Sequence, residues 1–109
     1  MSEEVSYRDF KKLDIRIGMI VQIERVKGSD KLYVIQVDMG DHTRQILSSL
    51  VDYYSEEEMM GKRIAVVCNL KPAKMFGLAS NGMLLCAEIE GDLSLITTDK
   101  PIKNGAKIT

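Results

Sequence analysis

The 109-residue sequence is short of the residue types on which most catalytic sites depend. Its single histidine, His42, falls in a predicted hairpin turn beside Asp41, where a turn role is more usual than general-base catalysis. Ser48 and Ser49 lack the flanking glycines that expose a nucleophile at a strand-to-helix elbow. The glycines stand alone, so no glycine-rich phosphate loop is present. These absences argue against an enzyme, and the sequence predicts a binding protein without a cofactor.

Cysteine is also scarce, and both cysteines, Cys68 and Cys86, lie within apolar runs. They show neither the paired spacing of a metal site nor a disulfide framework, so we expect small core residues and no metal. Buried thiols suit a reducing compartment. No apolar run is long enough for a signal peptide or a membrane span. The sequence therefore predicts a cytoplasmic protein without membrane association.

Negative charge is missing from one part of the chain. Residues 61–87 hold four Lys and Arg and no Asp or Glu, whereas residues 1–60 hold 8 basic and 12 acidic residues. The net charge of the whole chain is −1. A local basic surface can attract a polyanion although the molecule is nearly neutral. Four solvated cations without a partner are the alternative for this segment taken alone.

Hydrophobic alternation predicts a chain made mainly of strands. Residues 14–26 and 32–39 alternate with a period of two, and 43–49, 63–70 and 83–89 are the other predicted strands. Gly18 in the middle of the first strand predicts a β-bulge or a sharp coil of the strand, and Gly40-Asp41 predicts a hairpin turn. Ser6 is placed to cap a short helix over residues 7–12.

The connection after the third predicted strand changes character. Ser55 is a second predicted helix N-cap, three glutamates follow it in the first helical turn, and Gly61 ends the segment. A short helix between strands three and four of a small barrel is the arrangement of the oligonucleotide-binding (OB) fold. We therefore predict one domain over residues 1–109, an all-β, five-stranded OB-fold barrel with a C-terminal extension.

The segment 69–83, between the fourth and fifth strands, combines cations, amides, a hydroxyl and exposed apolar groups. Such a mixture suits phosphates, base edges and base stacking. On an OB barrel this loop borders the groove that crosses strands two and three. Lys31 precedes strand two, and Arg44 and Gln45 lie on strand three. The predicted nucleic-acid contacts are Lys31, Arg44, Gln45, Asn69, Lys71, Lys74, Met75, Ser80 and Met83.

Four motifs follow one another along the chain: Asp14-Ile15-Arg16-Ile17-Gly18, Ser29-Asp30-Lys31-Leu32, Arg44-Gln45-Ile46, and Asn69-Leu70-Lys71-Pro72-Ala73-Lys74-Met75 with Gly77, Ser80, Gly82 and Met83. In this order they resemble the tRNA-binding OB-domain family over nearly the whole chain. The family includes the C-terminal domain or separate β subunit of methionyl-tRNA synthetases, free-standing tRNA-binding proteins and the domain of the endothelial monocyte-activating cytokine. One turn departs from the family pattern, because Lys27-Gly28 stands where relatives usually carry His-Pro.

The resemblance implies structure-selective binding of tRNA, largely outside the anticodon, by a homodimer. It also implies assistance to aminoacylation, with the methionyl-tRNA synthetase catalytic chain as a candidate partner. Because the sequence starts at Met1 and stops where the family domain stops, we expect the free-standing or β-subunit form. Relatives dimerise through their terminal segments, which indicates Phe10, Leu13 and the tail after Leu95 as dimer contacts.

A sister branch, the CsaA-type export chaperones, shares the barrel and the dimer but binds unfolded polypeptides. Its central motif is nearer Asn-Phe-Pro-Pro-Lys, whereas this chain has Asn69-Leu70-Lys71-Pro72 and an intact Ser80-Asn81-Gly82-Met83. These motifs favour tRNA binding over the binding of unfolded polypeptides. The alternatives are a chaperone with an apolar groove from Met75, Phe76 and Met83, and a purely structural dimerisation module of a synthetase complex.

Overall fold

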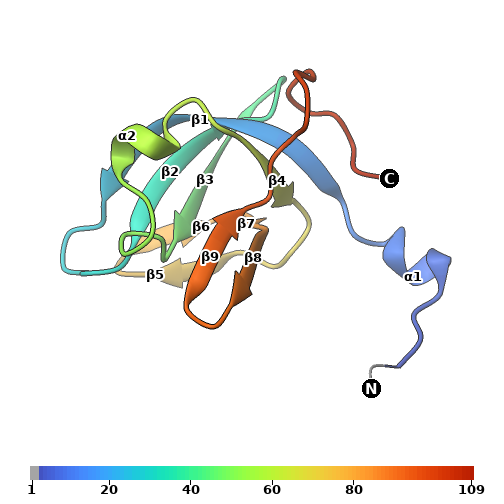
Figure 1. Cartoon of the computed structure of the whole chain (residues 1–109), viewed down its shortest axis with the longest axis horizontal. Helices are drawn as coiled ribbons and strands as arrows, with labels where there is room; N and C mark the ends of the chain where they lie inside the picture. The colour runs from blue at the N-terminus through green and yellow to red at the C-terminus, as the bar shows by residue number, and fades with distance from the viewer. Residues whose placement is uncertain (1–2) are drawn as a thin grey trace.

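The computed structural model describes residues 3–109 and shows an antiparallel barrel with two small hairpins (Figure 1). The main sheet has the order β3-β2-β1-β4-β7. Its strands are β1 (Ile15–Arg25), β2 (Tyr33–Asp38), β3 (Thr43–Ser48), β4 (Arg63–Val67) and β7 (Met83–Leu84). The hairpins are β5 (Ala73–Met75) with β6 (Leu78–Ser80), and β8 (Cys86–Ile89) with β9 (Asp92–Leu95).

Two four-residue helices complete the fold: α1 (Tyr7–Phe10) before the barrel and α2 (Glu56–Met59) between β3 and β4. Ser6 caps α1, as predicted, and its side chain accepts a hydrogen bond from the Asp9 amide. Ser55 and Glu58 form a capping box at the start of α2. The OB-like barrel with a short helix between its third and fourth strands is therefore confirmed. No helix in residues 3–109 has the length and apolar character needed to cross a bilayer.

The barrel interior is built from the alternate residues that the period of two predicts. Tyr33, Ile35 and Val37 of β2 point inward, and Met59 of α2 packs against the same cluster. A smaller apolar cluster lies elsewhere on β1 and β4, where Ile15 and Ile17 pack with Ala65 and Val67. The C-terminal tail adds Ala106 and Ile108 to this smaller cluster.

The predicted bulge at Gly18 is wrong. Gly18 pairs regularly with Ile64 of β4, and the register shift lies further along β1, between Ile20 and Gln22. A Cβ atom at Gly18 would lie 2.5 Å from Val37 Cγ1 and 2.6 Å from the sulfur of Met39. Glycine is therefore required by close packing against β2.

Two other predicted elements differ from the structure. The predicted fifth strand, 83–89, is divided at Leu85, whose amide donates to Ala65 O while its carbonyl accepts from Ile96 N. The chain therefore changes partner there, from β4 to the β8–β9 hairpin. The segment predicted as a loop contains the β5–β6 hairpin, whose turn residues Phe76 and Gly77 have φ of 52° and 78°. Two successive positive φ values are typical of a tight type I′ hairpin turn.

The C-terminal tail runs back along β1, as Figure 1 shows. Gly105 N donates to Ile17 O at 2.7 Å, and Ile108 N donates to Ile15 O at 2.8 Å. The chain before β1 is held by Asn69, whose side-chain oxygen accepts from Asp14 N at 2.8 Å and whose nitrogen donates to Lys12 O at 2.7 Å. The chain that leads into β1 and the C-terminal tail therefore lie near the same end of the barrel.

Candidate nucleic-acid interface

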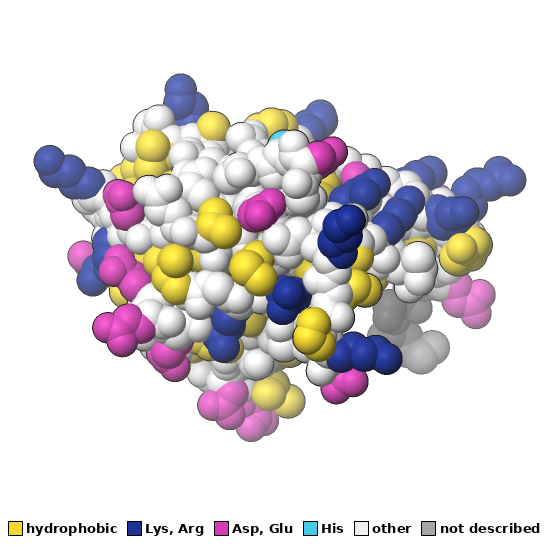
Figure 2. All heavy atoms as spheres, turned by 90° about the horizontal axis from the view of Figure 1, so that it is seen from above, with side chains coloured by type: hydrophobic (Ala, Val, Ile, Leu, Met, Phe, Trp, Pro, Cys, Tyr) yellow, Lys and Arg dark blue, Asp and Glu magenta, His cyan; other side chains and the backbone are white. Residues whose placement is uncertain are grey.

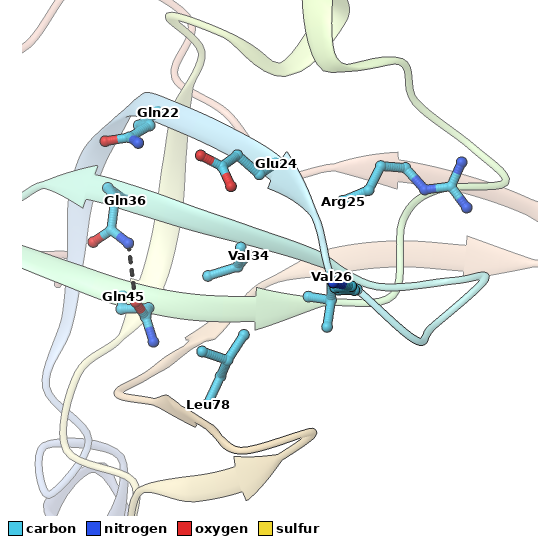
Figure 3. Close-up of a pocket in the computed structure, with 9 residues that line it drawn as sticks. Gln22, Glu24, Arg25, Val26, Val34, Gln36, Gln45 and Leu78 are labelled. Carbon is cyan, nitrogen blue, oxygen red and sulfur yellow. Dashed lines mark hydrogen bonds between the residues drawn. The ribbon is translucent and has the colours of Figure 1, made fainter.

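The outer face of β1, β2 and β3 forms the floor of a groove of about 330 Å³ (Figure 3). Because side chains alternate along a strand, Ile35 points into the barrel while Val34 and Gln36 line the groove. The groove is lined by Gln22, Glu24, Arg25, Val26, Lys27, Val34, Gln36, Gln45 and Leu78.

The β5–β6 hairpin and the β1–β2 loop border this floor. Gln45 Nε2 donates to Ala79 O at 2.9 Å, and Leu78 packs on the cluster of Val26, Leu32 and Leu47. The ring of Phe76, at the tip of the β5–β6 hairpin, lies close to Gly28 of the β1–β2 loop. A Cβ atom added to Gly28 would be 3.7 Å from this ring. The segment 69–83 thus borders the groove over strands two and three, as the sequence predicted.

The β1–β2 loop requires its glycine. Gly28 has a φ of +90°, whereas proline holds φ near −65°. The His-Pro pair of the family pattern therefore does not fit this loop conformation. The departure at Lys27-Gly28 lets the loop turn beside Phe76 and close one end of the groove.

Of the nine predicted contacts, Gln45 lines the groove itself. Six others are exposed on loops and strands outside its lining: Lys31, Asn69, Lys71, Lys74, Met75 and Met83. Lys71 and Lys74 are exposed and take part in no salt bridge among residues 3–109. Met75 is 40% exposed and Met83 47%. Lys31 is also exposed and lies 3.9 Å from the Asp52 carboxylate. These side chains offer cations and polarisable apolar surface to a ligand.

The predicted contact at Arg44 is occupied by intramolecular hydrogen bonds. Arg44 Nη1 donates to Cys68 O and to Asn81 O, both at 3.0 Å. Its Nε donates to His42 Nε2 at 3.1 Å. The guanidinium therefore joins the start of β3 to the chain following β4 and following β6. Arg44 holds the wall of the groove in place.

Ser80 and Asn69 also use their polar groups within the protein. Ser80 is only 6% exposed, and its hydroxyl accepts from Leu47 N at 3.0 Å and donates to Gly82 O at 3.2 Å. The prediction of a direct RNA contact through Ser80 is corrected, because burial hides the hydroxyl and both of its hydrogen-bonding roles are taken. Asn69 binds the backbone on both sides of Leu13, so its amide groups anchor the chain before β1.

His42 extends the Arg44 network to Asp41. Because Nε2 of His42 accepts from Arg44, its Nδ1 carries the proton and donates to the Asp41 carboxylate at 2.6 Å. This hydrogen bond is the main reason that the pKa of Asp41 lies below its usual range. Burial raises the pKa of the Cys68 and Cys86 thiols, which therefore stay protonated at neutral pH. Residues 3–109 contain no group of three His, Cys, Asp or Glu suited to a metal ion.

Sequence reasoning missed two groups of residues. Gln22, Glu24 and Gln36 of the groove floor give no local signal, because isolated polar residues on a strand usually face solvent. Figure 2 shows Lys and Arg side chains gathered at the end of the molecule that carries α1 and the chain ends. There, Lys11 and Lys107 line one small cavity. Adjacent lysines at positions 11 and 12 were the available signal, within residues 1–60, which are acidic overall.

A family model and curated relatives both relate this chain to proteins of tRNA binding or aminoacylation. A family model described as "Putative tRNA binding domain" matches residues 15–107. The methionine–tRNA ligase of Methanocaldococcus jannaschii is 46% identical over 107 residues, which are 97% of this chain and 16% of that protein. The ligase of Archaeoglobus fulgidus is 46% identical over 106 residues, with the same two shares. The chain thus spans about one sixth of the length of these curated relatives.

Two solved structures also resemble the chain closely. A MetRS-related protein from Pyrococcus horikoshii superposes with a TM-score of 0.94 at 34% identity, covering 99% of this chain and 100% of that one. The chaperone CsaA from Bacillus anthracis superposes with a TM-score of 0.91 at 27% identity, covering 98% and 100%. The same barrel therefore occurs in proteins with two differently named roles.

Proposed function

This chain belongs to the tRNA-binding domain family, and on that premise we propose that it binds folded tRNA along the groove between β1–β3 and the β5–β6 hairpin. The observation that carries the proposal is the acid-free segment 61–87, which supplies the hairpin bordering the groove. Lys71 and Lys74 are exposed there for phosphates, and Met75 and Phe76 for stacking. Arg44 and Ser80 hold the hairpin against β3 and position these contacts.

Similarity to methionine–tRNA ligases supports a narrower role. We propose that residues 1–109 act as one auxiliary tRNA-binding unit that assists aminoacylation, either free-standing or as a β subunit beside a methionyl-tRNA synthetase catalytic chain. Tethering tRNA through a second site raises its effective concentration at the catalytic chain without new contacts there. Such a role places the protein in the cytoplasm. Copurification of tRNA and a synthetase with the protein tests it, and recovery of neither contradicts it.

The salt dependence of binding tests the tRNA proposal directly. We expect the logarithm of the tRNA affinity to fall linearly with the logarithm of salt concentration, with a slope of about −0.7 to −0.9 for each phosphate contacted. Fluorescence anisotropy with labelled tRNA measures the slope, and an unstructured RNA of the same length is the matched control. Binding that is independent of salt, or equal for both RNAs, contradicts structure-selective tRNA recognition.

A homodimer is the second part of the proposal. The terminal segments expose apolar side chains, with Phe10 38%, Leu13 42% and Ile102 47% exposed. Phe10 and Leu13 also line a cavity of about 140 Å³ with the C-terminal Ile108. Burial of this surface against a second copy would remove it from water.

Aspartate at both Phe10 and Leu13 is therefore expected to convert a dimer into a monomer, because two charges would have to be buried in the interface. Light scattering after size-exclusion chromatography measures the mass. The exposed residue Ile89, 70% exposed on the β8–β9 hairpin, provides the control Ile89→Asp, which should leave the mass unchanged. A wild-type protein that is monomeric at micromolar concentration contradicts the homodimer.

A polypeptide-binding role is the alternative that one observation favours. Phe76 is 59% exposed in the turn of the β5–β6 hairpin, next to the exposed Met75. Two CsaA chaperone structures also resemble the chain. Soft apolar side chains adapt to varied partners. Suppression of the aggregation of an unfolded client, without a shift of tRNA in a mobility assay, would select this role over tRNA binding.

A further inference from the structure

Three glutamines form a row across neighbouring strands on the floor of the groove (Figure 3). Gln22 of β1 pairs in register with Gln36 of β2, and Gln36 pairs with Gln45 of β3. Gln36 Nε2 donates to Gln45 Oε1 at 3.1 Å, and Gln45 Nε2 donates to Ala79 O at 2.9 Å. The hairpin therefore fixes the row at its β3 end, and the amides of Gln36 and Gln45 are oriented before any ligand arrives.

The other end of the row keeps its polar groups free. Among residues 3–109, no side-chain hydrogen bond engages Gln22 or the Oε1 atom of Gln36. Glu24 lies two residues after Gln22 on β1 and pairs with Val34, so it extends into the same groove. In Figure 3 its carboxylate is directed toward the middle of the groove, whereas Arg25 points away. The guanidinium of Arg25 donates instead to Asp30 O at 3.3 Å.

Glu24 indicates which part of an RNA fits here. A carboxylate repels phosphates, so a groove that held only the RNA backbone would be weakened by it. An ionised carboxylate is purely an acceptor of hydrogen bonds, whereas the glutamine amides both donate and accept. Apolar groups from Val26, Val34 and Leu78 line the same space. Such a lining matches a flat, partly apolar ring that has N–H donors and a carbonyl acceptor on its edge, which describes a nucleobase.

The size of the groove and the hydrogen-bond acceptor at Glu24 indicate which nucleobase fits best. A volume of about 330 Å³ is at the lower end of the roughly 300–1,000 Å³ range of small-ligand sites, so it suits one nucleotide. Guanine has two adjacent donors, N1–H and the N2 amino group, on its Watson–Crick edge, and a carboxylate can accept from both. Its O6 carbonyl lies next to them and needs a donor, which a glutamine amide supplies.

We propose that this groove binds one unpaired guanine nucleotide, with Glu24 accepting from the N1 and N2 donors and the side-chain nitrogens of Gln22 and Gln36 donating to the adjacent carbonyl. The Nε2 group of Gln36 has two hydrogens, and Gln45 takes only one of them. The inference rests on the proposed tRNA function and adds a base preference to it. Lys27, at the end of the groove by the β1–β2 loop, is placed for the phosphate of the same nucleotide. The domain would then recognise a folded tRNA partly through a splayed-out guanine.

The four nucleoside monophosphates GMP, AMP, CMP and UMP test this site on the full chain. Titration followed by nuclear magnetic resonance should move the side-chain amide signals of Gln22 and Gln36 most strongly with GMP. Glu24→Gln is expected to weaken GMP binding about tenfold and leave AMP binding unchanged, since a good base contact of this kind discriminates by that order. Equal shifts with all four nucleotides, or none, would overturn the proposal.

Binding of tRNA to the same variant provides a second test, in which the sign of the change is decisive. If Glu24 only repels phosphates, Glu24→Gln tightens tRNA binding, whereas the loss of a guanine contact weakens it. Glu88→Gln on β8 makes the same charge change away from the groove lining and should tighten binding slightly or not at all. Weaker binding by Glu24→Gln alone supports the guanine site, and tighter binding overturns it. If wild-type protein fails to bind tRNA, the proposed function fails while the GMP titration still decides this site.

Discussion

Replacement of Lys71 and Lys74 together by alanine is expected to weaken tRNA binding on the order of tenfold or more, and to reduce the salt slope by about two phosphate contacts. Both side chains are exposed on the segment bordering the groove, and neither is neutralised by an acidic partner among the described residues 3–109. Because they contact little of the protein, the free energy of unfolding should change by no more than about 0.5 kcal/mol. Anisotropy titrations at several salt concentrations and urea denaturation measure the two quantities.

The control for this double variant is Lys100→Ala with Lys103→Ala. It removes the same charge from the C-terminal tail, which does not line the groove over β1–β3. Because both lysines lie in the tail that is a candidate dimer contact, light scattering must show that the control keeps the mass of the wild type. An equal loss of tRNA affinity in both double variants would mean that only the overall charge matters. A double variant at Lys71 and Lys74 that unfolds would instead assign the two lysines to the folded structure.

Arg44→Ala is expected to lower the free energy of unfolding by about 2–4 kcal/mol and to weaken tRNA binding as a consequence. The half-buried guanidinium donates two 3.0 Å hydrogen bonds, to Cys68 O and to Asn81 O. Charged hydrogen bonds of this kind are worth about 1.5–3 kcal/mol, and their loss leaves two carbonyls without a donor. Without Arg44 the β5–β6 hairpin is less firmly held against β3. Urea denaturation measures the loss of stability, and a mobility assay measures the loss of tRNA binding.

Arg44→Lys separates this supporting role from a phosphate contact. Lysine keeps the charge but presents a single ammonium group, which does not reproduce the fixed geometry of the guanidinium. We therefore expect Arg44→Lys to be destabilised nearly as much as Arg44→Ala. A lysine variant with normal stability and normal tRNA affinity would show that charge alone matters at this position, contrary to the structure-based assignment.

Local patterns predicted the first four strands of the barrel and both helix starts, because each depends on neighbouring residues. Alternation along 32–39 placed Tyr33, Ile35 and Val37 in the core, where they are buried. Ser6 and Ser55 cap helices whose first turns are within three residues of them. The role of Gly18 was missed because the reason for glycine is a contact with Val37 and Met39, about twenty positions away.

The candidate site was predictable as a region but not in its detail. The charge distribution and motifs identified the segment 69–83 and strands two and three, which do border one groove. Residue type alone did not distinguish side chains that are free to contact a ligand from side chains that hold the fold together. Ser80, Arg44 and Asn69 are polar like Lys71, yet each also binds a backbone group that lies between 24 and 57 positions away in the sequence.

By itself, the sequence determined the barrel class, the position of the helix between β3 and β4 and the membership in a tRNA-binding family. Those properties follow from local sequence patterns: the alternation of apolar residues, helix caps and short motifs. Only the tertiary structure decided which polar groups are free, because a polar group is free or engaged according to what the fold brings within 3 Å of it. Folding engages Ser80 and Arg44 in the walls, and it brings Gln22, Glu24 and Gln36 into one groove from two strands.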